Sequence, residues 1–150
     1  MTRRGFTNFL AGGASACALL SAGCATAPDA AAPAATIRLT GAHEVPGPGD
    51  ADGSGMARIR LDEASGSVCF ELVVRDIAPA TMAHIHPGAA GEAGSPPLVA
   101  LAAPTSGRSQ GCVAVPQAVA ARLRANPAAF FVNIHNAPFP GGALRGQLQL

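Results

Sequence analysis

Three histidines occur in two short segments that combine imidazoles with apolar, β-branched residues. His84 and His86 flank Ile85, and His135 follows Ile134 later in the chain. In a β-strand successive side chains point to opposite faces, so His84 and His86 would share one face. Neutral imidazole is a good ligand for copper and for zinc, and three histidines around one open position suit either metal. The spacing predicts a shared copper or zinc site formed by all three histidines, provided that the two strands are neighbours.

A second interpretation gives the same histidines a structural role without metal. Each would form a hydrogen bond to a carbonyl or carboxylate and so attach a glycine-rich loop to the sheet. His43 is a further candidate ligand, and the adjacent Glu44 is interpreted as a carboxylate that orders a loop rather than as a catalytic acid. Arg145 follows a Pro-Gly-Gly turn. It is expected to pair with Glu44 or Glu92, in a structural role that depends on burial.

Catalytic signatures are missing from the sequence. Its serines lie in Gly- and Pro-rich turns, and it contains neither a G-x-S-x-G context nor a phosphate loop or dinucleotide fingerprint. We therefore predict a module that is not an enzyme and binds no nucleotide. Without Arg3 and Arg4, eight of the ten basic residues remain against nine acidic ones. This near-neutral charge gives no indication of nucleic-acid binding.

The N-terminus resembles an export signal followed by a tether. Residues 1–23 combine paired arginines with an uncharged run of small and apolar residues, too short for a membrane span. Because small residues precede Cys24, the segment resembles a bacterial lipoprotein signal, in which that cysteine is lipidated. Plain secretion is the alternative, and the export route could be the twin-arginine or the Sec pathway. We expect a cell-envelope lipoprotein, anchored through Cys24 to the outer membrane and facing the periplasm or the cell surface.

Beyond the signal, residues 24–35 form an Ala- and Pro-rich tether, and residues 36–150 suit one domain with its own core. Strand-like runs recur between turn signals at 36–40, 55–61, 67–76, 81–86, 98–101, 112–115, 130–135 and 144–150. Many short strands separated by glycine and proline predict an all-β fold, either an antiparallel Greek-key sandwich or a partly closed barrel. The run 116–126 starts with proline and stops before another, so it predicts one short helix.

Two cysteines, Cys69 and Cys112, lie within the domain. Each alternates with bulky apolar residues, so both would lie on the outer faces of strands. In an exported protein this arrangement predicts a disulfide. Free thiols or soft metal ligands are the alternatives, but no C-x-x-C spacing supports them.

Several motifs in combination resemble the CHRD domain, the module named for its repeats in chordin and also found singly in bacterial exported proteins. The matching segments are Leu39 to Pro46, Thr81 to Gly88 with Gly91 and Gly94, Asn126-Pro127, Phe131 to Asn136, and Phe139 to Leu148. The resemblance spans nearly the whole expected domain. It implies an immunoglobulin-like or barrel-like β-module with no established catalytic residues, and it adds protein–protein recognition as a function in which the histidines would be purely structural.

A weaker likeness is to copper–zinc superoxide dismutases, which also carry a His-x-His strand on a Greek-key barrel. In that likeness His84, His86 and His135 would correspond to copper ligands. The loop 88–97 contains only Glu92 as a candidate for the zinc ligands of that family, so full dismutase activity is not expected. A dismutase-like redox site remains the enzymatic alternative to a binding or structural module.

Overall fold

The computed structural model describes residues 1–2, 34–62, 64–94 and 96–150 of the chain. Nearly all of the expected export signal, Cys24 and most of the expected tether lie outside these residues. The described domain is an antiparallel sheet of eight strands in the order β5-β4-β7-β8-β1-β2-β3-β6. Its two edge strands, β5 and β6, come into contact, so the sheet curls into a nearly closed barrel. The all-β prediction is therefore confirmed, in its barrel form.

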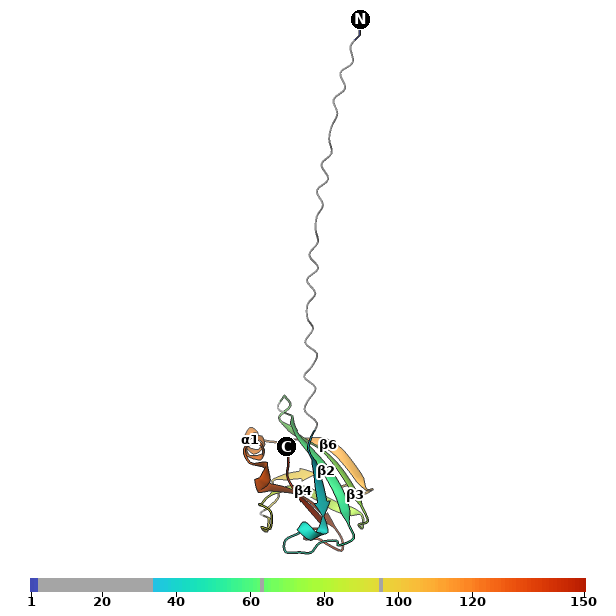
Figure 1. Cartoon of the computed structure of the whole chain (residues 1–150), viewed down its shortest axis with the longest axis vertical. Coiled ribbons are helices and arrows are strands. Elements are labelled where there is room, and N and C mark those ends of the chain that lie inside the picture. Colours follow the sequence, from blue (N-terminus) through green and yellow to red (C-terminus); the bar gives the residue numbers. More distant parts are fainter. Residues whose placement is uncertain (3–33, 63, 95) are drawn as a thin grey trace. The chain divides into compact units, whose positions relative to one another are not determined.

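Six of the eight strands agree with the predicted runs within one residue at each end, whereas β6 begins four residues before its predicted start and β8 ends three residues before its predicted end. Their bounds are β1 Thr36–Thr40, β2 Ser54–Asp62, β3 Ser67–Arg75, β4 Ala80–Pro87, β5 Val99–Leu101, β6 Arg108–Ala114, β7 Phe130–Asn136 and β8 Leu144–Gln147. Two 3₁₀ turns, η1 Gly41–His43 and η2 Pro127–Ala129, precede the second and seventh strands. Figure 1 shows β2, β3 and β6 running side by side.

The barrel interior is built from alternate residues of the strands. In β2 the alternation buries Ala57 and Ile59, while Arg58 and Arg60 point outward and are exposed. All eight strands contribute apolar side chains to one continuous core. Burial of this kind stabilises a fold by about 25 cal/mol per Å² of apolar surface, so the period-two pattern determines which face of each strand points inward.

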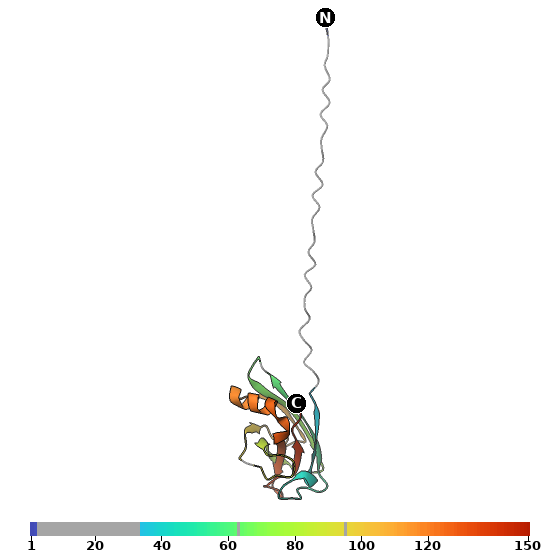
Figure 2. The ribbon, with the colours of Figure 1, turned by 60° about the vertical axis from the view of Figure 1, so that its left-hand side comes forward.

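One helix, α1 (Gln117–Ala125), packs against the barrel, as Figure 2 shows in orange. It starts one residue later than predicted, because Pro116 is its N-cap rather than its first helical residue. Leu123 is fully buried and Val119 packs against the same core, so the predicted apolar stripe docks the helix. None of the described helices has the length and hydrophobicity needed to span a bilayer.

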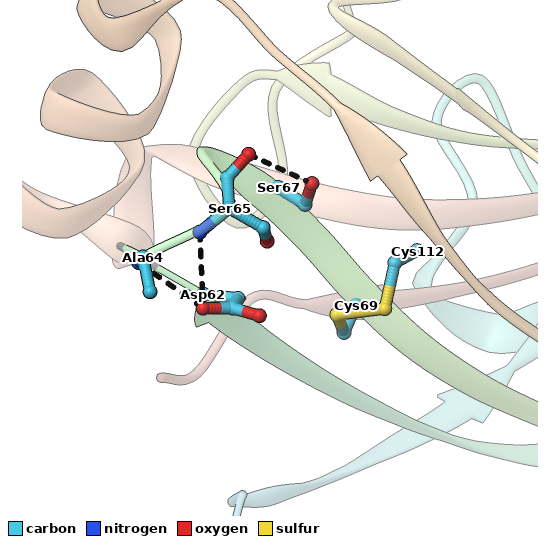
Figure 3. The surroundings of a disulfide bond; sticks show 6 residues. All are labelled: Asp62, Ala64, Ser65, Ser67, Cys69 and Cys112. Atoms are coloured by element: carbon cyan, nitrogen blue, oxygen red, sulfur yellow. Dashed lines mark hydrogen bonds between the residues drawn. A yellow bond between two sulfur atoms is a disulfide. The ribbon is translucent and has the colours of Figure 1, made fainter.

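The predicted disulfide is present between β3 and β6. Cys69 and Cys112 are directly paired across the two strands and are joined by an S–S bond of 2.05 Å. Figure 3 shows the bond lying across the two neighbouring strands, near the turn in which Asp62 accepts hydrogen bonds from the backbone of Ala64 and Ser65. Disulfides are typical of proteins in oxidising compartments.

Candidate functional site

β4 presents two of the three histidines outward. Ala83 and Ile85 are buried in the core, so His84 and His86 occupy the opposite face of the strand. We call the outward side of β4, β7 and β8, which carries His84, His86 and His135, the histidine face. β7 pairs directly with β4, with His84 opposite Asn133, so the condition for a shared site is met.

β7 supplies His135, which lies on the same face but is only 7% exposed. Its Nδ1 lies 3.0 Å from the carbonyl oxygen of Pro140. Because a carbonyl oxygen can only accept, Nδ1 carries the hydrogen and Nε2 keeps a lone pair. That Nε2 lies 3.2 Å from Nδ1 of His84. The Pro140 carbonyl thus fixes the tautomer that leaves His135 Nε2 able to bind a metal ion.

The three imidazoles converge. One ring nitrogen from each of His84, His86 and His135 lies within 4.8 Å of the others. Two imidazoles bound to one tetrahedral zinc ion, with Zn–N of about 2.0–2.1 Å, place their nitrogens about 3.4 Å apart. The observed 3.2 Å between His84 and His135 agrees with that spacing. The third nitrogen would need to approach the other two by at most about 1.4 Å.

The electrostatic environment favours neutral imidazoles. Burial lowers the pKa of His84 below its usual value, and the neighbouring His135 and His86 lower it further. Burial likewise lowers the pKa of His135, against the opposing effect of the Pro140 carbonyl. Neutral imidazole is the form that binds metal ions, so these two side chains are held in the binding state near neutral pH.

Phe131 orients the third histidine. The ring of His86 stacks on that of Phe131 at 5.2 Å between centroids and 6° between planes. The guanidinium carbon of Arg145 lies 3.5 Å from the centroid of the same ring, within the range of a cation–π contact. Groups that fix a ligand side chain in this way lower the conformational entropy lost on binding.

A buried carboxyl group lies beside the histidines. Asn133, between Phe131 and His135 on the same face of β7, donates from Nδ2 to both oxygens of Glu44 at 2.9 Å. Burial raises the pKa of Glu44 to about 7, although the charge of Arg145 and the Asn133 hydrogen bond both lower it. The interpretation of Glu44 as a carboxylate that orders a loop agrees with this geometry.

Arg145 is 2% exposed and holds the 88–94 segment over the histidine face. Its guanidinium donates to the backbone carbonyls of Glu92 and Ala89 at 2.8 and 2.9 Å. Burial lowers the pKa of Arg145, and the charges of both expected partners, Glu44 and Glu92, act on it in the opposite direction and raise it. The Glu92 carboxylate accepts its hydrogen bond from the backbone N–H of Ala89. The expected structural role of Arg145, dependent on burial, does agree with these contacts.

The structure leaves His43 apart from the other histidines. It lies exposed at the end of η1, and its nitrogens are not among those that converge on the face of β4 and β7. Sequence reasoning also missed Phe131 as the support of His86. The alternation of Phe131, Asn133 and His135 was a usable signal, because it places all three on one face.

Comparison with known proteins gives one match. The family model of the CHRD domain matches residues 35–148, which include every described strand and all the residues of the histidine face. Neither the curated proteins nor the solved structures include a match to this chain. Because the family model covers well over half of its length, the chain belongs to the CHRD domain family.

Proposed function

We propose that this protein is an extracytoplasmic binding module that holds one copper or zinc ion through His84, His86 and His135. Membership of the CHRD family suggests a binding or structural module. The observation that carries the proposal is the convergence of three imidazole nitrogens, from two adjacent strands, within 4.8 Å. The tautomer of His135 and the lowered pKa values of His84 and His135 support it. Three protein ligands leave an open position for water or a partner's ligand.

The proposed setting is the cell envelope. The lipoprotein-like segment ending at Cys24 supports an anchored protein, with residues 24–35 as the tether and the domain beginning at 36. The disulfide between Cys69 and Cys112 supports an oxidising compartment. The membrane is thus a proposed partner through the lipid, and a second protein is a proposed partner at the open metal position.

The test is metal titration of the chain produced without residues 1–24, because the unlipidated thiol of Cys24 would itself bind copper and zinc. We expect one equivalent of Cu(II) or Zn(II) to bind near neutral pH, and at least a tenfold loss of affinity in each of H84A, H86A and H135A. H43A is the matched control, because that histidine is exposed and outside the cluster, and it should bind like the wild type. Absence of stoichiometric binding in the wild type would remove the proposal.

A structural clasp is the second candidate function, and the hydrogen bonds favour it specifically. His84, His135 and the Pro140 carbonyl form a chain that joins β4, β7 and the loop before β8 without any metal. If the clasp is the whole role, H135A destabilises the metal-free chain while neither metal raises the wild-type melting temperature. If metal binds, the bound ion raises the melting temperature by an amount that grows with the logarithm of its affinity.

Redox catalysis is a separate outcome of the same experiment. A dismutase-like reaction would require bound copper at these histidines and consumption of superoxide by the loaded protein. We propose binding rather than catalysis, because the family is one of binding or structural modules. Superoxide consumption by the copper-loaded wild type, lost in H84A, would replace this proposal with the enzymatic alternative.

A further inference from the structure

An exposed methionine lies on the histidine face of β4. Met82 precedes His84 by two residues, and the intervening Ala83 is buried in the core, so Met82 points to the same side as the histidines. Its side chain is 45% exposed. A single exposed apolar residue is ordinary on a protein surface. What distinguishes Met82 is its position beside three imidazoles.

A β-bulge brings Met82 opposite His135. Ala80 pairs with Asn136, but the next pair is Met82 with His135, so Thr81 is the extra residue. Without that extra residue Thr81 would face His135 and Met82 would turn to the inner side of the strand. The Thr81 hydroxyl donates to the His135 carbonyl at 3.3 Å, which holds the bulge in place. Bulges are frequent beside functional sites, where they redirect a side chain.

Directly opposed residues of an antiparallel pair have Cβ atoms about 4.5–5.5 Å apart. Met82 therefore lies beside His135 across the strands and beside His84 along its own strand. Its unbranched side chain has three rotatable bonds, so the sulfur can turn toward either imidazole. Because Met82 is about half exposed, its side chain is not locked in the core.

Three imidazoles accept copper and zinc alike, whereas a thioether is a soft, uncharged ligand that selects Cu(I). We propose that Met82 is a fourth, thioether ligand of the histidine site, and that it makes the site one that retains copper as Cu(I). This inference rests on the proposed metal-binding function. It specifies the metal and its oxidation state, which the histidines by themselves do not.

The test compares M82L with M56L in the chain without residues 1–24, so that the thiol of Cys24 cannot bind copper or add a sulfur scatterer. Met56 is the matched control, because it is 48% exposed on the outer face of β2, where its cross-strand partners are Arg38 and Val73. Cu(I) affinity is measured without oxygen by competition with a Cu(I)-specific chelator, and Zn(II) affinity by competition with a zinc indicator. We expect M82L to lower Cu(I) affinity at least tenfold with Zn(II) affinity unchanged, and M56L to match the wild type in both.

A second measurement detects the proposed copper–sulfur bond directly. The copper X-ray absorption spectrum of the Cu(I)-loaded wild type should contain a sulfur scatterer, which M82L lacks and M56L keeps. Equal Cu(I) affinity in the wild type and M82L would overturn the thioether ligand and leave the histidine site standing. An equal loss of Cu(I) and Zn(II) binding in M82L would also overturn it, because sulfur chemistry would not be the cause. Failure of the wild type to bind either ion would instead remove the proposed function.

Discussion

The buried side chain of Glu44 should make the stability of the domain depend on pH. Its carboxyl group is 6% exposed, and burial raises its pKa from 4.5 in the unfolded chain to about 7 in the folded one. Between these two values the folded state binds more protons than the unfolded state, so the free energy of unfolding falls as pH rises. The contribution of Glu44 is fully present below about pH 4.5 and lost above about pH 7.

E44Q removes this titration while keeping an oxygen that can accept from Asn133 Nδ2. We expect the stability of E44Q relative to the wild type to rise by about 3 kcal/mol between pH 4.5 and pH 7.5. Urea unfolding followed by far-ultraviolet circular dichroism at several pH values measures this difference, in which the titration of unchanged groups cancels. Parallel stability curves for the two proteins would contradict the raised pKa.

Gly142 makes room for the same carboxyl group. Its φ is +148°, a conformation that residues with side chains rarely adopt, and a Cβ there would lie 2.5 Å from the Cδ of Glu44. We expect G142A to lose about 2 kcal/mol or more of unfolding free energy. G141A is the control, because a Cβ at the preceding residue would meet nothing within 4 Å. If the two variants unfold at the same urea concentration, close packing on Glu44 is not what requires glycine.

For single residues, the sequence predicted the strand face on which a side chain lies better than it predicted the groups that surround that side chain. Alternation alone places His84, His86 and His135 on one side of two strands, and they do lie there. It does not show that His135 is buried, because the outer side of β7 is contacted by the loop before β8, through Pro140, and by Glu44 from far along the chain. The hydrogen-bond partners of Glu44 and Arg145 could not be predicted either, because they depend on how loops pack against the histidine face.

The strands and the helix were predictable wherever apolar and polar residues alternate. β1 agrees with its prediction at both ends, and β2, β3, β4 and β7 agree within one residue at each end. β6 was predicted from residue 112 but begins at Arg108. Its first half, Arg108-Ser109-Gln110-Gly111, carries no apolar pattern and is a strand only because it pairs with β3. Such tertiary pairing overrides local preference, and a single sequence does not reveal it.

The disulfide fastens this weakly patterned strand to its neighbour. Cys69 and Cys112 are 43 residues apart, and in the chain-entropy model a closed loop of that length contributes about 4 kcal/mol. We expect the double variant C69A/C112A to lose about 2–4 kcal/mol of unfolding free energy. Reducing agent should produce a similar loss in the wild type and none in the variant. Equal stability of the oxidised wild type and the variant would show that pairing with β3 suffices to hold β6 in place.

The described domain as a whole has two kinds of interior. One is the apolar core inside the barrel, to which every strand contributes. The other is a polar layer on the histidine face, where Glu44, Asn133 and Arg145 are buried beneath loops and satisfied largely by hydrogen bonds to one another or to backbone carbonyls. Buried polar groups need partners with good geometry, so this layer holds its side chains in fixed positions. A barrel with such a layer provides a rigid support for a metal site.

The proposed placement of the whole chain in the cell envelope rests on Cys24. In a bacterial host with an outer membrane, grown with a palmitate analogue that can be labelled, we expect the wild type to carry lipid and C24A to carry none. C17A is the matched control, because this cysteine lies inside the expected signal and should not affect lipidation. The Cys69–Cys112 disulfide, detected by protection of thiols from alkylation, reports export separately. A wild type with the disulfide but without lipid would indicate plain secretion, whereas label on C24A would place the lipid on another residue.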